Sequence, residues 1–304
     1  MYLFVINVFS GNGRGQRAWR KIEPILKRDQ TPYRFIMLNT EQAMDAVLNH
    51  IHNKETAWKA VAIVGGDGTI HSLLPILINA GIPTGLIPAG SGNDTARELG
   101  IPMKPQAALK TLLRGSTIKL DLIRTTMQDS TSHYTLTAVA TGFDGMIAAK
   151  VDQSFYKSWC NRLGLGSFAY IIALLQTLVT FRPFEVSVTI DGKKCSFEKG
   201  WLIAIANTSS YGGGLAICPT AVPDDQMLNI CIVHSCTPLT LLSLFPTVLF
   251  GKHIKLPYVT MLTGQNIMIE ANDDRCIPSL GDGESLGSPP LRAELVPQSL
   301  IMIK

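Results

Sequence analysis

Two glycine-rich segments that contain carboxylates carry the most specific chemistry in this sequence. Gly-Gly-Asp-Gly-Thr occupies 65–69 and Gly-Ser-Gly-Asn-Asp occupies 90–94, each directly after a short apolar segment. Glycine lets the backbone approach an anion closely, and loops that follow parallel strands gather at one edge of a sheet. The segments therefore predict a site for a phosphorylated ligand, in which Asp67 and Asp94 share a Mg²⁺ or a hydrogen-bond network. The alternative for the second segment is that Asn93 or Asp94 simply caps the following helix.

A third glycine-rich segment, Ser-Gly-Asn-Gly-Arg-Gly at 10–15, lies between a predicted strand at 2–8 and a predicted helix at 17–28. Backbone N–H groups and the positive end of a helix dipole attract anions at such a position. Its glycine spacing differs from the G-x-G-x-x-G of dinucleotide-binding folds, and the chain has no G-K-[ST] of a Walker A loop. The segment is either a further anion-binding loop or a flexible turn.

A carboxylate far along the chain is a candidate base. Asp-Gly-Glu occupies 282–284. Phosphoryl transfer depends on positioning and charge neutralisation, and a carboxylate such as Glu284 can accept the proton of an attacking hydroxyl. Asp-Gly is also ordinary turn chemistry, so the alternative is that Glu284 is an exposed acid at a turn.

The pattern of apolar segments divides the chain into two parts. Over 1–125, short apolar strands alternate with helical segments, which is typical of βαβ units and a parallel sheet. After 125, strands of alternating character predominate, and Asp191-Gly192 between two of them predicts a hairpin. Helices are expected near 145–180 and 238–251. A ligand site is expected between the two parts.

Composition excludes several classes of protein. The chain has 304 residues, 46% hydrophobic and 16% charged, with a net charge of +4, which excludes a disordered or collagen-like chain. The excess of basic residues lies in 1–125; it suits a phosphate-bearing ligand and is too small to indicate nucleic-acid binding. The N-terminus lacks the basic region of a signal peptide, and the longest apolar runs are too short to cross a bilayer. The six cysteines lack metal-ligand spacing, which indicates reduced thiols in a cytoplasmic protein.

Taken in order, the motifs resemble those of the diacylglycerol kinase catalytic family, which includes bacterial lipid kinases and sphingosine and ceramide kinases and is more distantly similar to NAD kinase and 6-phosphofructokinase. The resemblance rests on the segments 7–11, 65–69, 88–94, 142–144, 211–214, 219–227 and 282–284, together with Asp121. It implies an α/β fold of two domains. The first is a phosphofructokinase/NAD kinase-like parallel-sheet domain over 1–125 with the C-terminal segment 291–304. The second, over 126–290, is an antiparallel, β-sandwich-like domain for the acceptor.

The resemblance also implies a reaction and the residues that perform it. Members of the family transfer the γ-phosphoryl group of ATP to a lipid hydroxyl with Mg²⁺, here to diacylglycerol or a related lipid such as phosphatidylglycerol. Glu284 matches the catalytic residue, and Asp67 and Asp94 would organise the metal and the nucleotide. The positions that match ATP-binding residues are Asn7, Ser10, Gly11, Thr40, Gly65, Gly66, Asp67, Gly68, Thr69, Ile70 and Ser91. A structural Mg²⁺ is implied at Val222, Asp225 and Met227, the first and last through backbone carbonyls.

Several positions depart from the family pattern. His71-Ser72 stands where members often have Asn-Glu, and the simplest alternative for His71 is a partly exposed helix residue. Gln226 replaces a glycine in the loop of the structural Mg²⁺. Because a side chain resists positive φ, glutamine at 226 disfavours the loop conformation that glycine allows at this metal site.

Two apolar segments are candidates for the acceptor side. Residues 164–170 and the helix after them resemble the family's helix near the lipid cleft, and 239–250 is followed by Lys252, His253 and Lys255, as in a helix that touches a membrane surface. A buried core helix is the alternative for each and is favoured for 239–250. A lipid acceptor implies a membrane lipid as partner and transient peripheral contact with the membrane. The sequence is also compatible with a homodimer.

Two other functions stay open. One is a soluble small-molecule kinase of the NAD kinase type, against which stand the apolar helices and the Asp-Gly-Glu at 282–284. The other is a nucleotide-binding regulatory protein without turnover, against which stand Asp67, Asp94 and Glu284. A lipid kinase is the favoured function.

Overall fold

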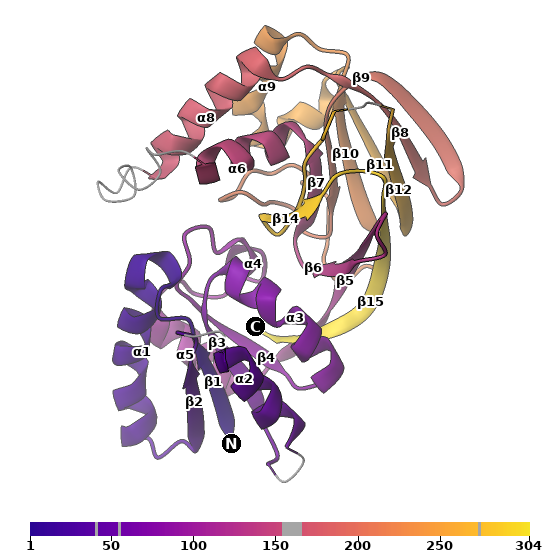
Figure 1. The fold of residues 1–304 in the computed structure, drawn as a ribbon. Helices are drawn as coiled ribbons and strands as arrows, with labels where there is room; N and C mark the ends of the chain where they lie inside the picture. The colour runs from indigo at the N-terminus through magenta and orange to yellow at the C-terminus, as the bar shows by residue number, and fades with distance from the viewer. Residues whose placement is uncertain (40–41, 54–55, 154–165, 273–274) are drawn as a thin grey trace.

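The computed structural model describes residues 1–39, 42–53, 56–153, 166–272 and 275–304. Within these ranges the strands belong to one continuous sheet that runs through two domains, and helices pack against it (Figure 1). Thr40, one of the predicted nucleotide-binding residues, lies outside the described residues.

The first domain is built on four parallel strands, β1 (Tyr2–Ile6), β2 (Tyr33–Met37), β3 (Ala60–Gly65) and β4 (Thr84–Pro88), which pair in the order β2-β1-β3-β4. Its helices are α1 (Ser10–Arg28), α2 (Gln42–His52), α3 (Asp67–Ala80), α4 (Asp94–Glu98) and α5 (Pro105–Arg114). α1 packs on α5 and α2 on α3, on opposite faces of the sheet (Figure 1). Because both faces are covered, β1 and β3 are buried along their whole length.

The second domain is antiparallel. Its strands are β6 (Ser132–Thr135), β7 (Ala138–Gly142), β8 (Phe184–Ile190), β9 (Lys193–Ala206), β10 (Leu228–His234), β11 (Val259–Gly264), β12 (Asn266–Ala271), β13 (Ser279–Gly281) and β14 (Glu284–Gly287). The main path of pairing is β14-β13-β7-β9-β8-β12, with β10 between β9 and β11. The predicted hairpin is confirmed, since β8 and β9 are joined by Asp191 and Gly192, whose φ angles are 47° and 84°.

Helices α6 (Phe143–Gln153), α8 (Gly166–Thr180) and α9 (Pro238–Val248) lie along one side of this domain, followed by the short 3-10 helix η1 (Lys252–Lys255) (Figure 1). α8 packs on both α6 and α9. The helices expected near 145–180 and 238–251 are therefore confirmed, although 154–165 lies outside the described residues.

Two long strands connect the domains. β15 (Leu291–Ile303) pairs antiparallel with β5 (Thr117–Met127) along most of its length. Its first part also pairs with β12 of the second domain, and Met302 near its end pairs in parallel with Thr84 of β4. The C-terminal segment thus returns to the first domain, and the predicted fold class is confirmed. The expected limits at 125 and 291 stay a prediction, because β5 continues across the first and β15 belongs to both domains.

Each domain has its own hydrophobic core. In the first, Phe4 and Ile63 of the sheet are buried together with Trp19 of α1 and Leu73 of α3. In the second, Trp201 is 1% exposed, and its indole N–H donates to the backbone carbonyl of Cys236 (3.0 Å). The indole thereby loses water without leaving its donor unpaired.

The cysteines within the described residues are free thiols. Cys218 and Cys231 are buried in the second core, and burial raises their pKa values, that of Cys231 to about 12. Both thiols therefore stay protonated and unreactive at neutral pH.

Candidate active site

The three glycine-rich loops pack against one another at the carboxyl edge of the parallel sheet. In chain order they are the first loop (10–15), the second loop (65–69) and the third loop (90–94). A Cβ atom on Gly66 would lie 2.6 Å from Cα of Gly90, and one on Gly11 would lie 2.1 Å from the carbonyl oxygen of Ala89. Such distances exclude any side chain at these two glycines. The loops predicted separately from sequence thus form one surface.

Asn7 joins the first loop to the second. Its Oδ1 accepts the backbone N–H groups of Phe9 and Ser10 (both 3.1 Å), and its Nδ2 donates to Oγ1 of Thr69 (3.0 Å). Asn7 and Ser10 were predicted to bind nucleotide. The structure places Asn7 as the residue that holds the loop in position.

The first loop is part of α1, which begins at Ser10 rather than at 17 as the sequence predicts. Three consecutive residues, Gly11, Asn12 and Gly13, nevertheless have left-handed φ angles of 56°, 58° and 78°. Such a turn makes a concave set of N–H groups of the type that binds anions. The conformation therefore fits a phosphate, and it explains why glycine occupies two of these positions.

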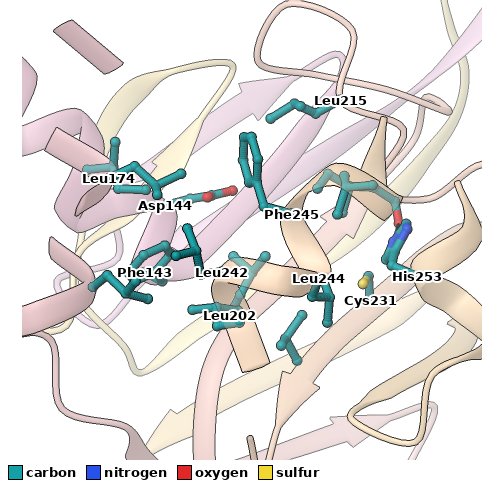
Figure 2. Close-up of a pocket in the computed structure, with 16 residues that line it drawn as sticks. Phe143, Asp144, Leu174, Leu202, Leu215, Cys231, Leu242, Leu244, Phe245 and His253 are labelled. Carbon is teal, nitrogen blue, oxygen red and sulfur yellow. Dashed lines mark hydrogen bonds between the residues drawn. The ribbon is translucent and has the colours of Figure 1, made fainter. Parts of the chain in front are cut away.

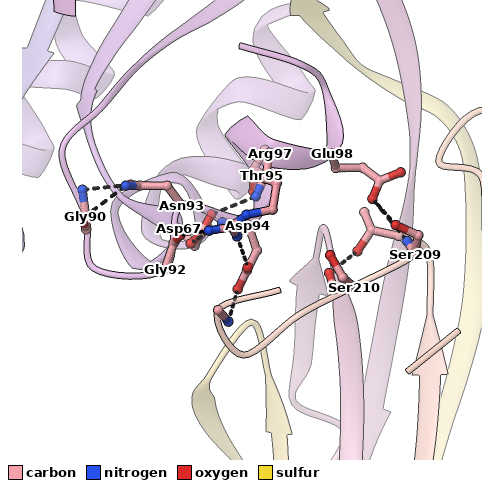
Figure 3. Close-up of polar contacts among 12 residues, drawn as sticks. Asp67, Gly90, Gly92, Asn93, Asp94, Thr95, Arg97, Glu98, Ser209 and Ser210 are labelled. Carbon is pink, nitrogen blue, oxygen red and sulfur yellow. Dashed lines mark hydrogen bonds and ion pairs between the residues drawn. The ribbon is translucent and has the colours of Figure 1, made fainter. Parts of the chain in front are cut away.

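The carboxylates of Asp67 and Asp94 belong to one hydrogen-bond network (Figure 3). The two oxygens of Asp67 accept the N–H groups of Asp94 and Thr95, each at 3.0 Å, so that Asp67 caps the first turn of α4. Asp94 is 7% exposed, and its Oδ1 lies 2.6 Å from a guanidinium nitrogen of Arg97. The expected hydrogen-bond network is therefore present, and a Mg²⁺ shared by the two carboxylates stays a prediction.

The environment of Asp94 favours its protonated form more than water does. Burial raises its pKa, the N–H of Gly213 opposes this, the negative charge of Asp67 raises the pKa further, and Arg97 lowers it. The net result is a raised pKa. A carboxyl group that is buried and crowded by a second carboxylate is typical of functional sites.

The second domain reaches this network through the loop after β9. Gly213 donates its N–H to Oδ2 of Asp94 (2.8 Å), and Ser209 donates its N–H (3.2 Å) and its hydroxyl (2.6 Å) to Glu98 (Figure 3). Sequence analysis did not single out Arg97, Glu98 or Ser209. The spacing of Asp94 and Arg97 by three residues was a signal for their pair, whereas the contact of Glu98 with Ser209 depends on the docking of two domains.

Glu284 lies beside the second glycine-rich loop. It begins β14 after a turn in which Asp282 and Gly283 have φ angles of 51° and 89°. A Cβ atom on Gly68 would lie 3.3 Å from Oε1 of Glu284, so the carboxylate faces the first turn of α3, next to Asp67. Glu284 is exposed. The structure therefore brings together acidic groups from both domains at the carboxyl edge of the sheet.

The other predicted nucleotide-binding residues divide into two groups. Ser91 is exposed, at the tip of the third loop. Thr69 and Ile70 are buried, and their N–H groups donate to the carbonyl of Gly66 (3.0 and 3.2 Å) as part of α3. Gly65 and Gly66 are buried as well, with Gly66 packed against Gly90, whereas Gly68 is exposed.

The loop predicted to hold a structural Mg²⁺ is anchored by Asp121. This fully buried carboxylate accepts the N–H of Gln226 and that of Gln298, both at 2.7 Å. Gln226 has a φ of 61°, so the glutamine adopts the left-handed conformation for which the family has glycine. In Asp225, Oδ1 accepts the N–H of Met227 (2.9 Å).

The donors of this loop fit Mg²⁺ in kind. A carboxylate from Asp225 and backbone carbonyls from Val222 and Met227 are hard oxygen ligands of the type that Mg²⁺ prefers. Asp225 is exposed, which leaves room for water ligands. Within the described residues no cluster of three acidic, histidine or cysteine side chains offers an alternative site.

An apolar pocket lies in the second domain between the sheet and the helices α6, α8 and α9 (Figure 2). Its walls include Leu174 and Leu178 of α8 and Leu244 and Phe245 of α9. His253 and Asp144 are polar residues of its lining; Asp144 accepts the phenolic O–H of Tyr211 (2.5 Å), and burial raises the pKa of Asp144. The pocket can therefore hold hydrocarbon next to one polar pair.

Among the helices of the described residues, none combines the length and the apolar character that crossing a membrane would need.

Comparisons with known proteins agree with the two-domain architecture. Residues 1–125 match the family model of the diacylglycerol kinase catalytic domain, and 137–304 match that of the YegS C-terminal NAD kinase beta sandwich-like domain. A diacylglycerol kinase of Mycobacterium tuberculosis is 35% identical over 246 residues, which cover 81% of this chain and 76% of the relative. A crystal structure of a diacylglycerol kinase from Bacillus anthracis superposes with a TM-score of 0.72 at 20% identity, covering 99% of this chain and 96% of that one. The chain therefore belongs to the diacylglycerol kinase family.

Proposed function

We propose that this protein is an ATP-dependent lipid kinase that phosphorylates the hydroxyl of diacylglycerol or of a related lipid such as phosphatidylglycerol. The observation that carries the proposal is the position of Glu284, a carboxylate of the second domain, beside Gly68 of the phosphate-type loop. The apolar pocket in the same domain supports a lipid rather than a small polar acceptor.

In this proposal the glycine-rich loops bind the triphosphate through backbone N–H groups. When bound, ATP supplies the γ-phosphoryl group and Mg²⁺ offsets its charge. Glu284 accepts the proton of the lipid hydroxyl while the hydroxyl oxygen bonds to the γ-phosphorus and the bond to ADP breaks. Asp67 accepts the N–H of Asp94 and so fixes the second loop against the third. Asp94 in turn accepts the N–H of Gly213 and so fixes the loop of the second domain.

The loop anchored by Asp121 has a structural role in the proposal. Val222, Asp225 and Met227 would hold a Mg²⁺ ion there, and the ion would stiffen the connection between this loop and the strands that join the domains. The lipid would come from a membrane, so we propose transient peripheral contact by a cytoplasmic protein.

The test is an assay with labelled ATP and Mg²⁺, offering diacylglycerol or phosphatidylglycerol in mixed micelles and NAD in parallel. We expect labelled lipid from the wild type and at least about a hundredfold less from Glu284→Gln. Labelled NAD phosphate without labelled lipid would replace the proposal with an NAD kinase type of activity. Binding of ATP without any labelled product would point to a regulatory protein.

A further inference from the structure

The two outer helices of the second domain carry no charged side chain. α8 has 15 residues and α9 has 11, and neither sequence contains Asp, Glu, Lys or Arg. Helices that meet water on one face ordinarily carry charged residues there. An uncharged outer face is therefore a feature that the fold of the domain alone does not require.

In α8 the helical period separates two apolar faces. Leu174 and Leu178 are buried and point toward the pocket. Ile172, Leu175 and Val179, which are spaced by three and four residues, are exposed, and Val179 is 86% exposed. Packing among the residues that the structure describes does not account for valine and leucine on this outer face.

In α9 and the residues after it the same division appears. Leu241, Leu244 and Val248 are buried, whereas Leu239 is 76% and Phe250 is 75% exposed. The sequence favoured a buried core helix for 239–250, and the structure shows that only one side of it is core. The outer side also carries Ser243 and has no charged residue up to Phe250.

These exposed residues are continuous with the pocket, because α8 packs on α9 and the inner faces of both helices line it. We call the exposed set Ile172, Leu175, Val179, Leu239, Leu249 and Phe250 the outer apolar face. The outer apolar face and the apolar pocket therefore lie on the same two helices. This arrangement suits a membrane as the source of a lipid that binds in the pocket.

The charges next to this face are basic. Lys252 and Lys255 of η1 are exposed and follow Phe250 directly. Basic residues beside an apolar helix are attracted to anionic lipid headgroups. An anionic bilayer complements both the lysines and the exposed phenylalanine and leucine, whereas a neutral protein surface would leave the lysine charges without a counter-charge.

We propose that the outer apolar face inserts into the interface of an anionic bilayer, with Lys252 and Lys255 on the headgroups, so that lipid enters the pocket between α8 and α9. The proposal rests on the proposed function, because that function requires an acceptor from a bilayer. In this proposal the outer apolar face binds a membrane. The alternative is that a second copy of the chain binds it, and the test must distinguish the two.

The test is co-sedimentation of the full chain with vesicles of phosphatidylcholine and phosphatidylglycerol in equal parts, and with vesicles of phosphatidylcholine alone. We expect binding to the anionic vesicles that weakens with added salt. The double variant Val179→Glu/Phe250→Glu should bind at least about tenfold more weakly, because two apolar side chains no longer enter the interface. Lys252→Glu/Lys255→Glu should lose the preference for anionic vesicles.

Met103→Glu and Met268→Glu are the matched controls, since both methionines are exposed by 40% or more and lie away from α8 and α9. They should bind as the wild type does. Phosphorylation of lipid dispersed in detergent is measured as well, because this assay tests the proposed function without requiring binding to a bilayer. A double variant that loses vesicle binding but phosphorylates dispersed lipid normally is the expected result.

Other results would overturn one idea and not the other. Unchanged vesicle binding by Val179→Glu/Phe250→Glu would show that the outer apolar face does not bind the membrane. A wild-type dimer that this variant dissociates, with no effect on vesicles, would assign the face to a second copy instead. Wild-type vesicle binding without phosphorylation of any lipid would leave the membrane face standing and refute the proposed function.

Discussion

Nδ1 of His71 lies 3.1 Å from Oδ2 of Asp282, so the helix that follows the second glycine-rich loop is tied to the turn that precedes Glu284. The same Asp282 accepts the N–H groups of Leu136 and Thr137 (2.8 and 2.7 Å). Burial lowers the pKa of His71, but its hydrogen bond to Asp282 and the charges of Asp282 and Glu284 raise it by more. A residue that departs from the family pattern is thus a contact between the domains.

His71→Ala is expected to lower kcat for lipid phosphorylation by about ten- to a hundredfold, because the turn that carries Glu284 loses one anchor. KM for ATP should change little, since the glycine-rich loops are untouched. His71→Asn, which restores a donor at this position, should recover part of kcat. Equal kcat values for wild type and His71→Ala would show that the contact does not position Glu284.

The His71–Asp282 pair also predicts a pH dependence of stability. Because the folded chain holds the imidazole proton more tightly than the unfolded chain, the pair stabilises fully below the ordinary histidine pKa. The stabilisation is lost as pH rises through the raised pKa of the folded form. The difference in free energy of unfolding between wild type and His71→Gln should therefore shrink from acidic to alkaline pH in denaturant titrations. A difference that stays constant would contradict this.

Glu284→Gln is expected to reduce kcat by about 10²- to 10⁴-fold, the usual contribution of a general base. Affinity for ATP, measured by calorimetry, should stay within about twofold, because the amide keeps the size of the side chain next to Gly68. Glu185→Gln, an exposed acid on β8, is the control and should leave kcat unchanged. Loss of ATP binding in Glu284→Gln would indicate a role in nucleotide binding rather than in proton transfer.

Asp121→Asn should destabilise the fold by about 1.5–3 kcal/mol, because a buried carboxylate that accepts two backbone N–H groups is replaced by an amide with a single acceptor oxygen. Asp224→Asn, an exposed acid near the same loop, should change stability by no more than about 0.5 kcal/mol. Denaturant unfolding of both variants measures the difference. Equal stability of the two variants would mean that Asp121 does not anchor the loop.

Gly66→Ala should reduce ATP affinity by about tenfold or more, since its Cβ would lie 2.6 Å from Cα of Gly90 and force the second and third loops apart. Gly81→Ala provides the control, because Gly81 has a φ of 61° but an added Cβ would meet nothing within 4 Å. It should cost stability alone. Calorimetric titration with ATP separates the two effects, and unchanged affinity in Gly66→Ala would show that contact between the loops is not needed for binding.

The sequence was sufficient for features that depend on local pattern. The loops at 65–69 and 90–94 could be placed together because the carboxyl ends of parallel strands meet at one edge. The sequence was not sufficient to predict which groups individual side chains bond to. Asp67 bonds to the first turn of α4 and Glu98 to Ser209, and both contacts depend on how separate elements dock.

Backbone conformation shows the same limit. Gln226 has a positive φ that its residue type disfavours, and the N–H group that this conformation presents is bonded to Asp121, 105 positions earlier in the chain. A contact of that range stabilises a conformation that local preference argues against. The early start of α1 has a similar cause, since Asn7 fixes the turn at Ser10.

The crossing of β5 and β15 between the domains limits how the two halves can move. The register shifts between Val296 and Leu300, and Asp121 holds Gln298 at this irregularity. Both strands run through this crossing without a flexible linker, so relative motion of the two domains requires the ribbon of β5 and β15 to bend. Movement of Glu284 relative to the glycine-rich loops of the first domain therefore depends on the stiffness of this two-stranded ribbon.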